Sequence, residues 1–169
     1  MPDVLILMGS DSDAPVMQSA VDALKEFGIT SEMTVASAHR SPARVMRLVD
    51  EAPGRGVKIF IVGAGAAAHL GGVVAAHTTL PVIGVPIDSS ALKGMDALLA
   101  TVQMPAGVPV ATVAIGKAGA ENAGLLAAQI LALADAELAT RLGKQKADMA
   151  AKVEEKDRRL AERRAERKA

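Results

Sequence analysis

The chain alternates short apolar runs with segments of helical periodicity, and this alternation limits the folds available to it. Residues 4–8 are a continuous apolar run, and residues 57–62 are apolar apart from Lys58; such runs are typical of parallel strands buried on both faces. Each strand-like run ends in glycine or small polar residues and leads into a segment with apolar residues at helical spacing. We therefore predict five β-α units, whose right-handed crossovers place helices on both faces of one parallel sheet.

The predicted boundaries follow the glycine and proline signals. We expect strands at residues 4–8, 30–37, 57–62, 81–85 and 110–115, and helices at residues 13–27, 41–52, 66–77, 91–101 and 120–134. Gly28 is expected just past the end of the first helix. The predicted class is a three-layer, flavodoxin-like α/β domain over residues 1–134, followed by a C-terminal helix and charged tail over residues 135–169.

The composition limits the class of protein and the chemistry that its side chains can support. The 169 residues suit one α/β domain, and its core must be aliphatic because the chain has two Phe, no Trp and no Tyr. Without cysteine there is no disulfide, thiolate metal site or cysteine nucleophile. No apolar run approaches the ~20 residues of a membrane span, and the N-terminus has no basic leader. We expect a cytoplasmic protein without membrane contact.

Three loops should meet at one place. A flavodoxin-like strand order of 2-1-3-4-5 puts the first strand between the second and the third. Its loop at residues 9–13 then lies between the loops at residues 37–42 and 63–72. Ligands of such sheets bind beyond the carboxyl ends of the strands, where the strand order reverses. We therefore predict a single binding crevice formed by these loops.

The loop after the second strand combines an anion-binding group with an acid/base group. Ser41-Pro42 is typical of an N-cap and first helical residue. Helix N-termini attract anions, and the planar guanidinium of Arg40 suits phosphate or carboxylate. His39 adds a side chain type that can exchange protons near neutral pH. The alternative is a histidine that merely faces solvent beside a capped helix.

The loop after the third strand has two interpretations. Gly63-x-Gly65-x-x-Ala68 matches the relaxed dinucleotide fingerprint, and Asp88 follows the next strand. However, this motif opens the third unit rather than the first, and we expect no second domain that could hold a substrate for hydride transfer. The other interpretation is that glycine and alanine let the backbone approach a small planar ligand closely.

Six segments together carry a family resemblance. They are Gly9-Ser10-x-Ser12-Asp13, Ser37-Ala38-His39-Arg40-x-Pro42, Gly63-Ala64-Gly65-x-Ala67-Ala68-His69-Leu70, Pro81-Val82-x-Gly84-Val85-Pro86, Val102-Gln103-Met104-Pro105 and Ala114-Ile115-Gly116-Lys117-Ala118-Gly119. In this order, over about residues 3–142, they resemble class I N5-carboxyaminoimidazole ribonucleotide mutase of bacterial purine biosynthesis. The chain departs from the family pattern at Ala66, where a third glycine is common, and at Gly71, where His-Leu-Pro-Gly is usual.

The resemblance implies a reaction and a set of roles. The family moves a carboxylate from the exocyclic nitrogen of aminoimidazole ribonucleotide to ring carbon 4, without metal, ATP, biotin or other cofactor. By resemblance His39 is the acid/base group, and the substrate is a small ribonucleotide. The substrate-binding residues implied in the same way are Ser10, Ser12, Asp13, Ser37, Arg40, Gly65, Ala67, Ala68, His69 and Leu70. The family also forms homo-octamers.

Several alternatives remain open at this point. From the residues alone, Ser10 and Ser12 fit a plain turn, Asp13 fits an N-cap without a ligand, and His69 is a rival base. The alternative functions are a direct carboxylase that uses free CO₂ or bicarbonate, and a non-enzymatic nucleotide-binding module.

The tail differs from the body in charge and pattern. Residues 1–143 carry 9 Lys and Arg against 13 Asp and Glu, whereas residues 144–169 carry 10 against 6. An apolar stripe at spacings of 7, 4, 7, 4 and 7 consists of Leu131, Leu138, Leu142, Met149, Val153 and Leu160. This 11-residue repeat predicts one nearly straight apolar face on a long helix. We expect the stripe up to Leu142 to contact a neighbouring subunit. Interleaved acids and absent aromatics argue against nucleic acid as a partner.

Overall fold

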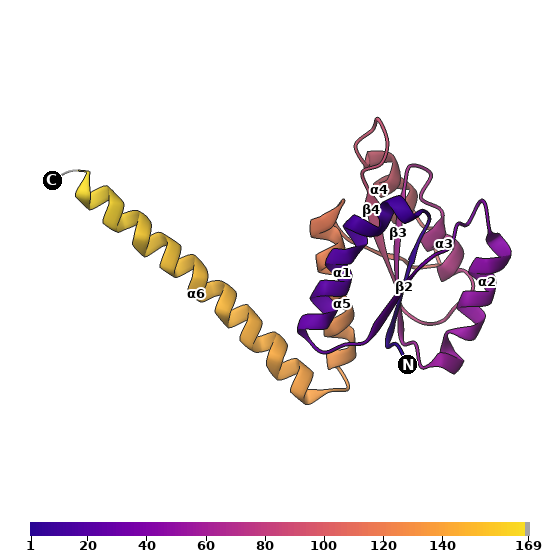
Figure 1. The fold of residues 1–169 in the computed structure, drawn as a ribbon, viewed down its shortest axis with the longest axis horizontal. Coiled ribbons are helices and arrows are strands. Elements are labelled where there is room, and N and C mark those ends of the chain that lie inside the picture. Colours follow the sequence, from indigo (N-terminus) through magenta and orange to yellow (C-terminus); the bar gives the residue numbers. More distant parts are fainter. Residues whose placement is uncertain (168–169) are drawn as a thin grey trace. The chain divides into compact units, whose positions relative to one another are not determined.

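Five parallel strands form the sheet, in the order β2-β1-β3-β4-β5 (Figure 1). In the computed structural model, which describes residues 1–167, they are β1 (Val4–Met8), β2 (Ser31–Val35), β3 (Ile59–Gly65), β4 (Val82–Ile87) and β5 (Ala111–Thr112). The predicted flavodoxin-like class and strand order are confirmed. The chain divides into two compact units, residues 1–128 and the residues from Gln129 onward.

Helices cover both faces of the sheet (Figure 1). They are α1 (Ala14–Glu26), α2 (Pro42–Glu51), α3 (Leu70–Ala75), α4 (Met95–Val102) and α5 (Lys117–Ala132), with 3-10 turns η1 (Asp11–Asp13) and η2 (Pro53–Arg55). Helices α2, α3 and α4 share one buried cluster with strands β1 and β3. On the other face α5 meets α1 closely, since a Cβ atom on Gly124 would lie 2.8 Å from the Ala20 carbonyl oxygen.

The central strand shows why the apolar runs fold as they do. All five residues of β1 are buried, because it pairs with β2 on one side and β3 on the other. Leu5 and Leu7 belong to the cluster beneath α2 and α3. Each fully buried leucine stabilises the fold by about 1.5–3 kcal/mol. A strand that is covered by helices on both faces buries every side chain, which is why all residues of β1 are apolar.

Several predicted boundaries need correction. Strand β3 continues through Gly63 to Gly65 instead of ending at Val62, because these residues pair with β4. A Cβ atom on Gly63 would lie 2.4 Å from the Met17 sulfur, so a side chain at this strand residue would require Met17 to move. Helix α3 begins at Leu70 rather than among the preceding alanines. Strand β5 has only two residues.

Helix α4 begins at Met95, four residues later than predicted. The delay follows from the backbone, since Lys93 has a φ of 51° and Gly94 a φ of 81°. Neither residue can take helical dihedral angles while it occupies the left-handed region. The preceding residues therefore form a turn, and the segment from Asp88 to Gly94 is a loop.

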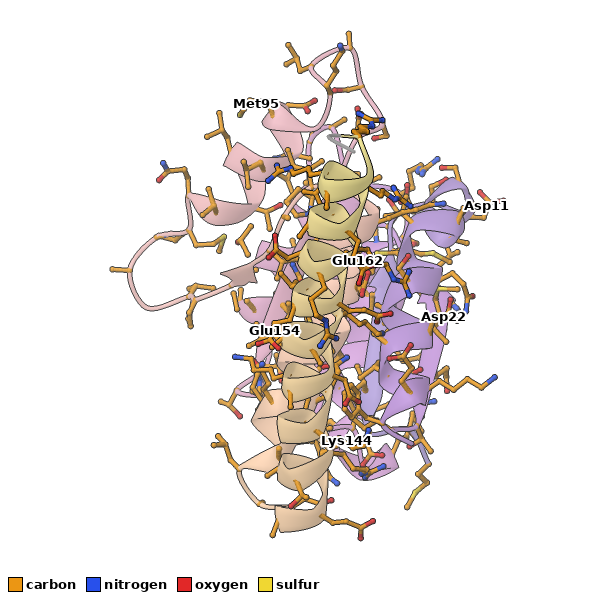
Figure 2. The ribbon with its side chains drawn as sticks, turned by 90° about the vertical axis from the view of Figure 1, so that its left-hand side faces the viewer. Asp11, Asp22, Met95, Lys144, Glu154 and Glu162 are labelled. Carbon is orange, nitrogen blue, oxygen red and sulfur yellow. The ribbon has the colours of Figure 1, made fainter. Side chains whose placement is uncertain are left out.

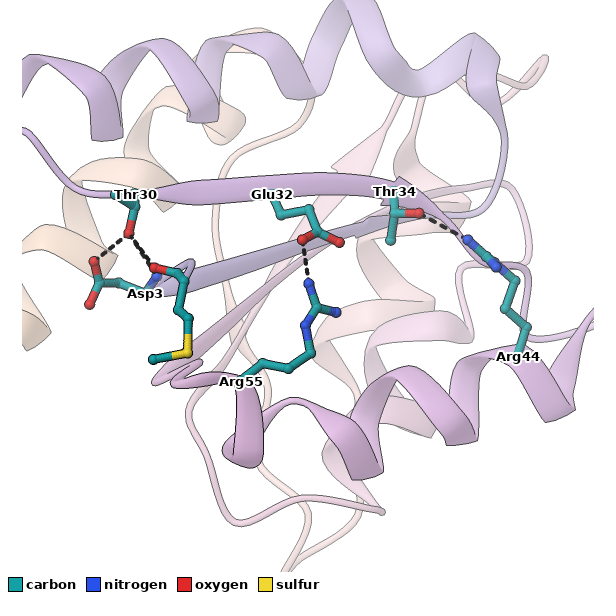
Figure 3. Close-up of polar contacts among 7 residues, drawn as sticks. Asp3, Thr30, Glu32, Thr34, Arg44 and Arg55 are labelled. Atoms are coloured by element: carbon teal, nitrogen blue, oxygen red, sulfur yellow. Dashed lines mark hydrogen bonds and ion pairs between the residues drawn. The ribbon is translucent and has the colours of Figure 1, made fainter.

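Polar contacts fasten the edge strand β2 to its neighbours (Figure 3). Arg55 pairs with Glu32, and Arg44 Nη2 donates to Thr34 Oγ1 at 3.1 Å. At the start of the strand Thr30 Oγ1 donates to Asp3 Oδ2 at 2.7 Å. These bonds fix the strand whose carboxyl end leads into the His39 loop.

The second unit contains the long helix α6 (Ala136–Glu166), which begins where the tail was expected. The Asp135 carboxylate caps it by accepting a hydrogen bond from the Leu138 amide at 2.9 Å. Charged side chains, including those of Lys144, Glu154 and Glu162, line this helix (Figure 2). The last two residues of the predicted tail, 168–169, lie outside the described residues.

The apolar stripe differs in exposure along its length in the single chain, and the expected subunit contact up to Leu142 stays a prediction. Leu138 is only 3% exposed, so it is buried without a neighbouring subunit. The most exposed members of the stripe on α6 are instead Met149, Val153 and Leu160, at 57%, 67% and 46%. These three side chains are therefore accessible in the single chain, and Leu142 is only partly buried.

Candidate active site

A cavity of about 410 Å³ opens at the carboxyl ends of β1, β2, β3 and β4. The three loops that were predicted to meet all contribute to it. Nine of the predicted site residues line the cavity: Ser10, Ser12, Asp13, Ser37, His39, Arg40, Gly65, Ala67 and Leu70. The volume lies within the range of small-molecule sites.

The loop after β1 is held by its own side chains. The Ser10 amide donates to Asp13 Oδ2 at 3.2 Å, and the Ser12 amide donates to Ser10 Oγ at 3.3 Å. This reciprocal capping closes the η1 turn. Asp13 precedes α1 but its carboxylate makes no cap bond to that helix. These hydrogen bonds are those of a plain turn, and the same side chains of Ser10, Ser12 and Asp13 belong to residues that line the cavity.

Asp13 is an unusual carboxylate because it is only 6% exposed. Burial raises the pKa of Asp13, and the nearby charge of Asp11 adds to the rise. The hydrogen bond from the Ser10 amide and the charge of Arg40 act in the opposite direction on this pKa. Partly desolvated oxygens of this kind bind hydroxyl groups of a ligand strongly.

The loop after β2 is organised around Ser37. The Ser37 amide donates to Ser41 Oγ at 3.0 Å, and Ser37 Oγ accepts from the Arg40 amide at 3.2 Å. Ser41 stands at the N-cap position of α2, but its hydroxyl makes no cap bond to that helix. The predicted N-cap position of Ser41 and start of the helix at Pro42 are confirmed, but the Ser41 hydroxyl is engaged with the backbone of Ser37 instead of capping the helix.

Arg40 reaches across to the neighbouring loop. Its Nη2 donates to the Gly9 carbonyl oxygen at 3.1 Å. A guanidinium has five N–H donors, so most of its donors stay available to a ligand anion. The bond to Gly9 fixes the guanidinium at the cavity wall beside the Ser10 turn.

The two predicted histidines are in direct contact. His39 Nε2 lies 2.8 Å from His69 Nδ1, and the rings are nearly perpendicular, at 86° with centroids 4.9 Å apart. One nitrogen must donate and the other accept, so a single proton is shared across this contact. His69 does not line the cavity itself but holds the ring of His39, which does.

The loop after β3 forms a wall of small residues. Gly65, Ala66 and Ala67 line the cavity, whereas Ala68 is buried behind them and does not. Ala66 has a φ of 50°, in the left-handed region that glycine adopts more easily. The departure from the family pattern therefore falls on a residue where a glycine would relieve backbone strain.

The sequence prediction missed a fourth loop. Ser89 follows β4 and lines the cavity, as do Gly9, Ala38, Ala64 and Ala66. The available signal was its place just after the carboxyl end of a strand. Asp88, the acidic residue of the dinucleotide interpretation, does not line the cavity.

Residues 1–167 contain neither a metal-binding cluster nor a membrane-spanning helix. In that range no group of three or more His, Cys, Asp or Glu side chains is arranged to bind a metal ion. No helix there has the length and apolar character needed to span a bilayer.

Comparisons with known proteins agree with this geometry. Residues 3–152 match the family model described as AIR carboxylase. The chain is 53% identical over 161 residues to N5-carboxyaminoimidazole ribonucleotide mutase of Pyrococcus horikoshii, covering 95% of this chain and 90% of that protein. It is 57% identical over 145 residues to the enzyme of the same name from Bacillus subtilis, covering 86% and 90%.

A solved structure has the same fold. The crystal structure of PurE from Treponema denticola superposes with a TM-score of 0.86 at 32% sequence identity, covering 95% of this chain and 99% of that one. The family model extends over most of the chain, from β1 into α6. The chain therefore belongs to the AIR carboxylase family.

Proposed function

We propose that this protein is an N5-carboxyaminoimidazole ribonucleotide mutase, which converts N5-carboxyaminoimidazole ribonucleotide to 4-carboxy-5-aminoimidazole ribonucleotide. The observation that carries the proposal is the hydrogen-bonded pair of His39 and His69 beside Arg40, at one cavity. The relatives that are 53% and 57% identical bear the name of this enzyme.

The chemistry needs one proton to be given and one to be taken. Protonation of the carbamate nitrogen by His39 breaks the N–C bond and releases CO₂ and the neutral aminoimidazole. Ring carbon 4 then attacks CO₂, and its proton returns to His39, so the net reaction is an isomerisation. His69 shares a proton with His39 at 2.8 Å and keeps that ring oriented through both steps.

The remaining residues bind the ligand in this proposal. Arg40 and the Ser10 turn hold the phosphate, and Asp13 accepts hydrogen bonds from the ribose hydroxyls. The wall of Gly65, Ala66 and Ala67 leaves room for CO₂ and excludes water from it. No cofactor has a role in these steps.

We also infer a cytoplasmic homo-oligomer, with an octamer expected from the family resemblance. Support comes from apolar side chains that are exposed in the single chain, among them Met95, Leu99 and Val102 at helical spacing on α4. Their burial between subunits would stabilise an assembly. Light scattering of the purified protein tests this inference.

The test of function is turnover of authentic substrate, followed by ultraviolet absorbance. His39→Asn should lose on the order of 10²-fold or more in turnover and still bind the nucleotide. His77→Asn is the matched control, since His77 lies outside the cavity and its Nδ1 contacts the Val73 carbonyl at 2.7 Å. Near-normal activity of His39→Asn would move the acid/base role to His69. A rate that depends on added bicarbonate would favour the direct carboxylase, and nucleotide binding without turnover would favour a binding module.

A further inference from the structure

Ser89 occupies space that exists only because residue 65 is glycine. A Cβ atom on Gly65 would lie 1.8 Å from Ser89 Oγ and 2.9 Å from Ser89 Cβ. The Ser89 hydroxyl therefore rests against the Gly65 backbone, at the cavity that both residues line. Such close packing places the hydroxyl at a defined point on the wall.

The loop that carries Ser89 is closed by its own bonds. The Ser89 amide donates to the Ile87 carbonyl at 3.1 Å, and the Lys93 amide donates to the Ser90 carbonyl at 3.1 Å. Ser90 Oγ accepts from the Leu92 amide at 3.2 Å. The two neighbouring serines thus differ, because the Ser90 hydroxyl closes the loop while Ser89 lines the cavity.

Ser89 is also chemically distinct within its wall. The other lining residues from the end of β3, the loop after it and the start of α3 are Ala64, Gly65, Ala66, Ala67 and Leu70, none of which has a polar side chain. Among residues 1–167, Ser89 Oγ has no hydrogen-bond partner. A hydroxyl that can both donate and accept is thus left for a ligand.

We propose that Ser89 is a substrate-binding residue that donates a hydrogen bond to the migrating carboxylate and retains CO₂ against the wall of small residues. The inference rests on the proposed mutase function, in which CO₂ must stay beside ring carbon 4 until it recombines. Arg40, His39 and Asp13 have roles at the phosphate, the reacting nitrogen and the ribose. Ser89 supplies the polar contact on the opposite wall.

The decisive measurement is the fate of the carboxyl carbon. Substrate labelled with ¹³C in its carboxylate is converted in the presence of unlabelled bicarbonate, and label in the product is measured together with any aminoimidazole ribonucleotide released. Ser89→Ala should lower kcat/KM by about 10-fold, as expected for one hydrogen bond to a charged group. It should also lower label retention and increase release of aminoimidazole ribonucleotide.

Controls separate this role from a structural one. Ser90→Ala should retain label as the unmodified protein does, and Ser89→Thr, which keeps a hydroxyl, should restore most of the retention. Thermal unfolding checks that the variants fold. If Ser89→Ala retains label like the unmodified protein, the inference is overturned while the mutase function stands. If the unmodified protein converts no substrate, the proposed function fails and the role of Ser89 falls with it.

Discussion

Replacement of Arg40 by lysine tests how the cavity holds phosphate. Arg40 uses Nη2 for the Gly9 carbonyl at 3.1 Å, and its other donors can form a planar pair with phosphate oxygens. Lysine keeps the charge but cannot bind Gly9 and two phosphate oxygens in one plane. The loss of one hydrogen bond to a charged group corresponds to about 1–3 kcal/mol, or roughly 5- to 150-fold in affinity.

The assay is calorimetric titration of aminoimidazole ribonucleotide and of its nucleoside, which lacks the phosphate. Arg40→Lys should weaken nucleotide binding by that factor and leave nucleoside binding nearly unchanged. Arg44→Lys is the matched control, because Arg44 contacts the Val35 carbonyl at 2.9 Å and does not line the cavity. Equal losses for the nucleotide and the nucleoside would show that Arg40 does not bind the phosphate.

Three further predictions concern stability. Burial raises the pKa of Asp13 in the native state above its ordinary 3.8, so the native state binds the carboxyl proton more tightly than the unfolded state does. The contribution of Asp13 to stability therefore falls as pH rises from 3.8 to the raised native-state pKa. Asp13→Asn should therefore raise the thermal midpoint at pH 7 and weaken nucleotide binding by roughly 10-fold or more; a lower midpoint would contradict this. Ala66→Gly should change the free energy of unfolding by no more than about 1.5 kcal/mol, in the stabilising direction, as measured by urea titration. Truncation after Gly143 should leave turnover nearly intact, whereas Leu138→Asp should cost at least about 2 kcal/mol of stability, because Leu138 is buried in the single chain. A fully stable Leu138→Asp protein would refute that placement.

The alternation of strands and helices could be predicted because it depends on short-range patterns, and the strand order was taken from the flavodoxin-like class that this alternation indicates. A continuous apolar run such as residues 4–8 can be satisfied only by burial on both faces, as β1 shows. Once strand order is known, the carboxyl ends of the strands place the loops without further information. This is why the sequence predicts that Ser10, His39 and Gly65 lie at one crevice.

The errors arise where tertiary contacts override local signals. Glycine usually marks a loop, yet Gly63 continues a strand because it pairs with β4, and the Met17 sulfur lies where its side chain would be. The start of α4 depends on left-handed dihedral angles at Lys93 and Gly94, and a lysine in the sequence does not predict such a conformation. Likewise, contact between His39 and His69 depends on ring positions set by two separate loops.

Ser89 is a site residue that the sequence pattern could not identify. Its presence after a strand was visible in the sequence, but Asp88 and Ser90 stand beside it with side chains of comparable chemistry. Only the packing against Gly65 and the different bonding of Ser90 identify Ser89 as the residue that faces the cavity. Sequence patterns can therefore locate the loops of this site, whereas the choice among adjacent polar residues requires coordinates.

The departure at Ala66 can be weighed in the same physical terms. An alanine at a φ of 50° costs about 1–2 kcal/mol relative to a right-handed conformation. Glycine would relieve this strain, but its freer unfolded chain would cost about 0.4–1 kcal/mol of stability. The two effects oppose each other and leave a difference of about 0–1.5 kcal/mol in favour of glycine, so stability alone gives at most a modest reason for glycine here. The loop that follows Ala66 carries His69, and the bonds from the Ala68 amide to Ala66 and from the His69 amide to Ala67, both 2.9 Å, fix its path. Alanine therefore restricts the segment that positions the histidine pair, and its main effect should be on the orientation of His69 rather than on folding.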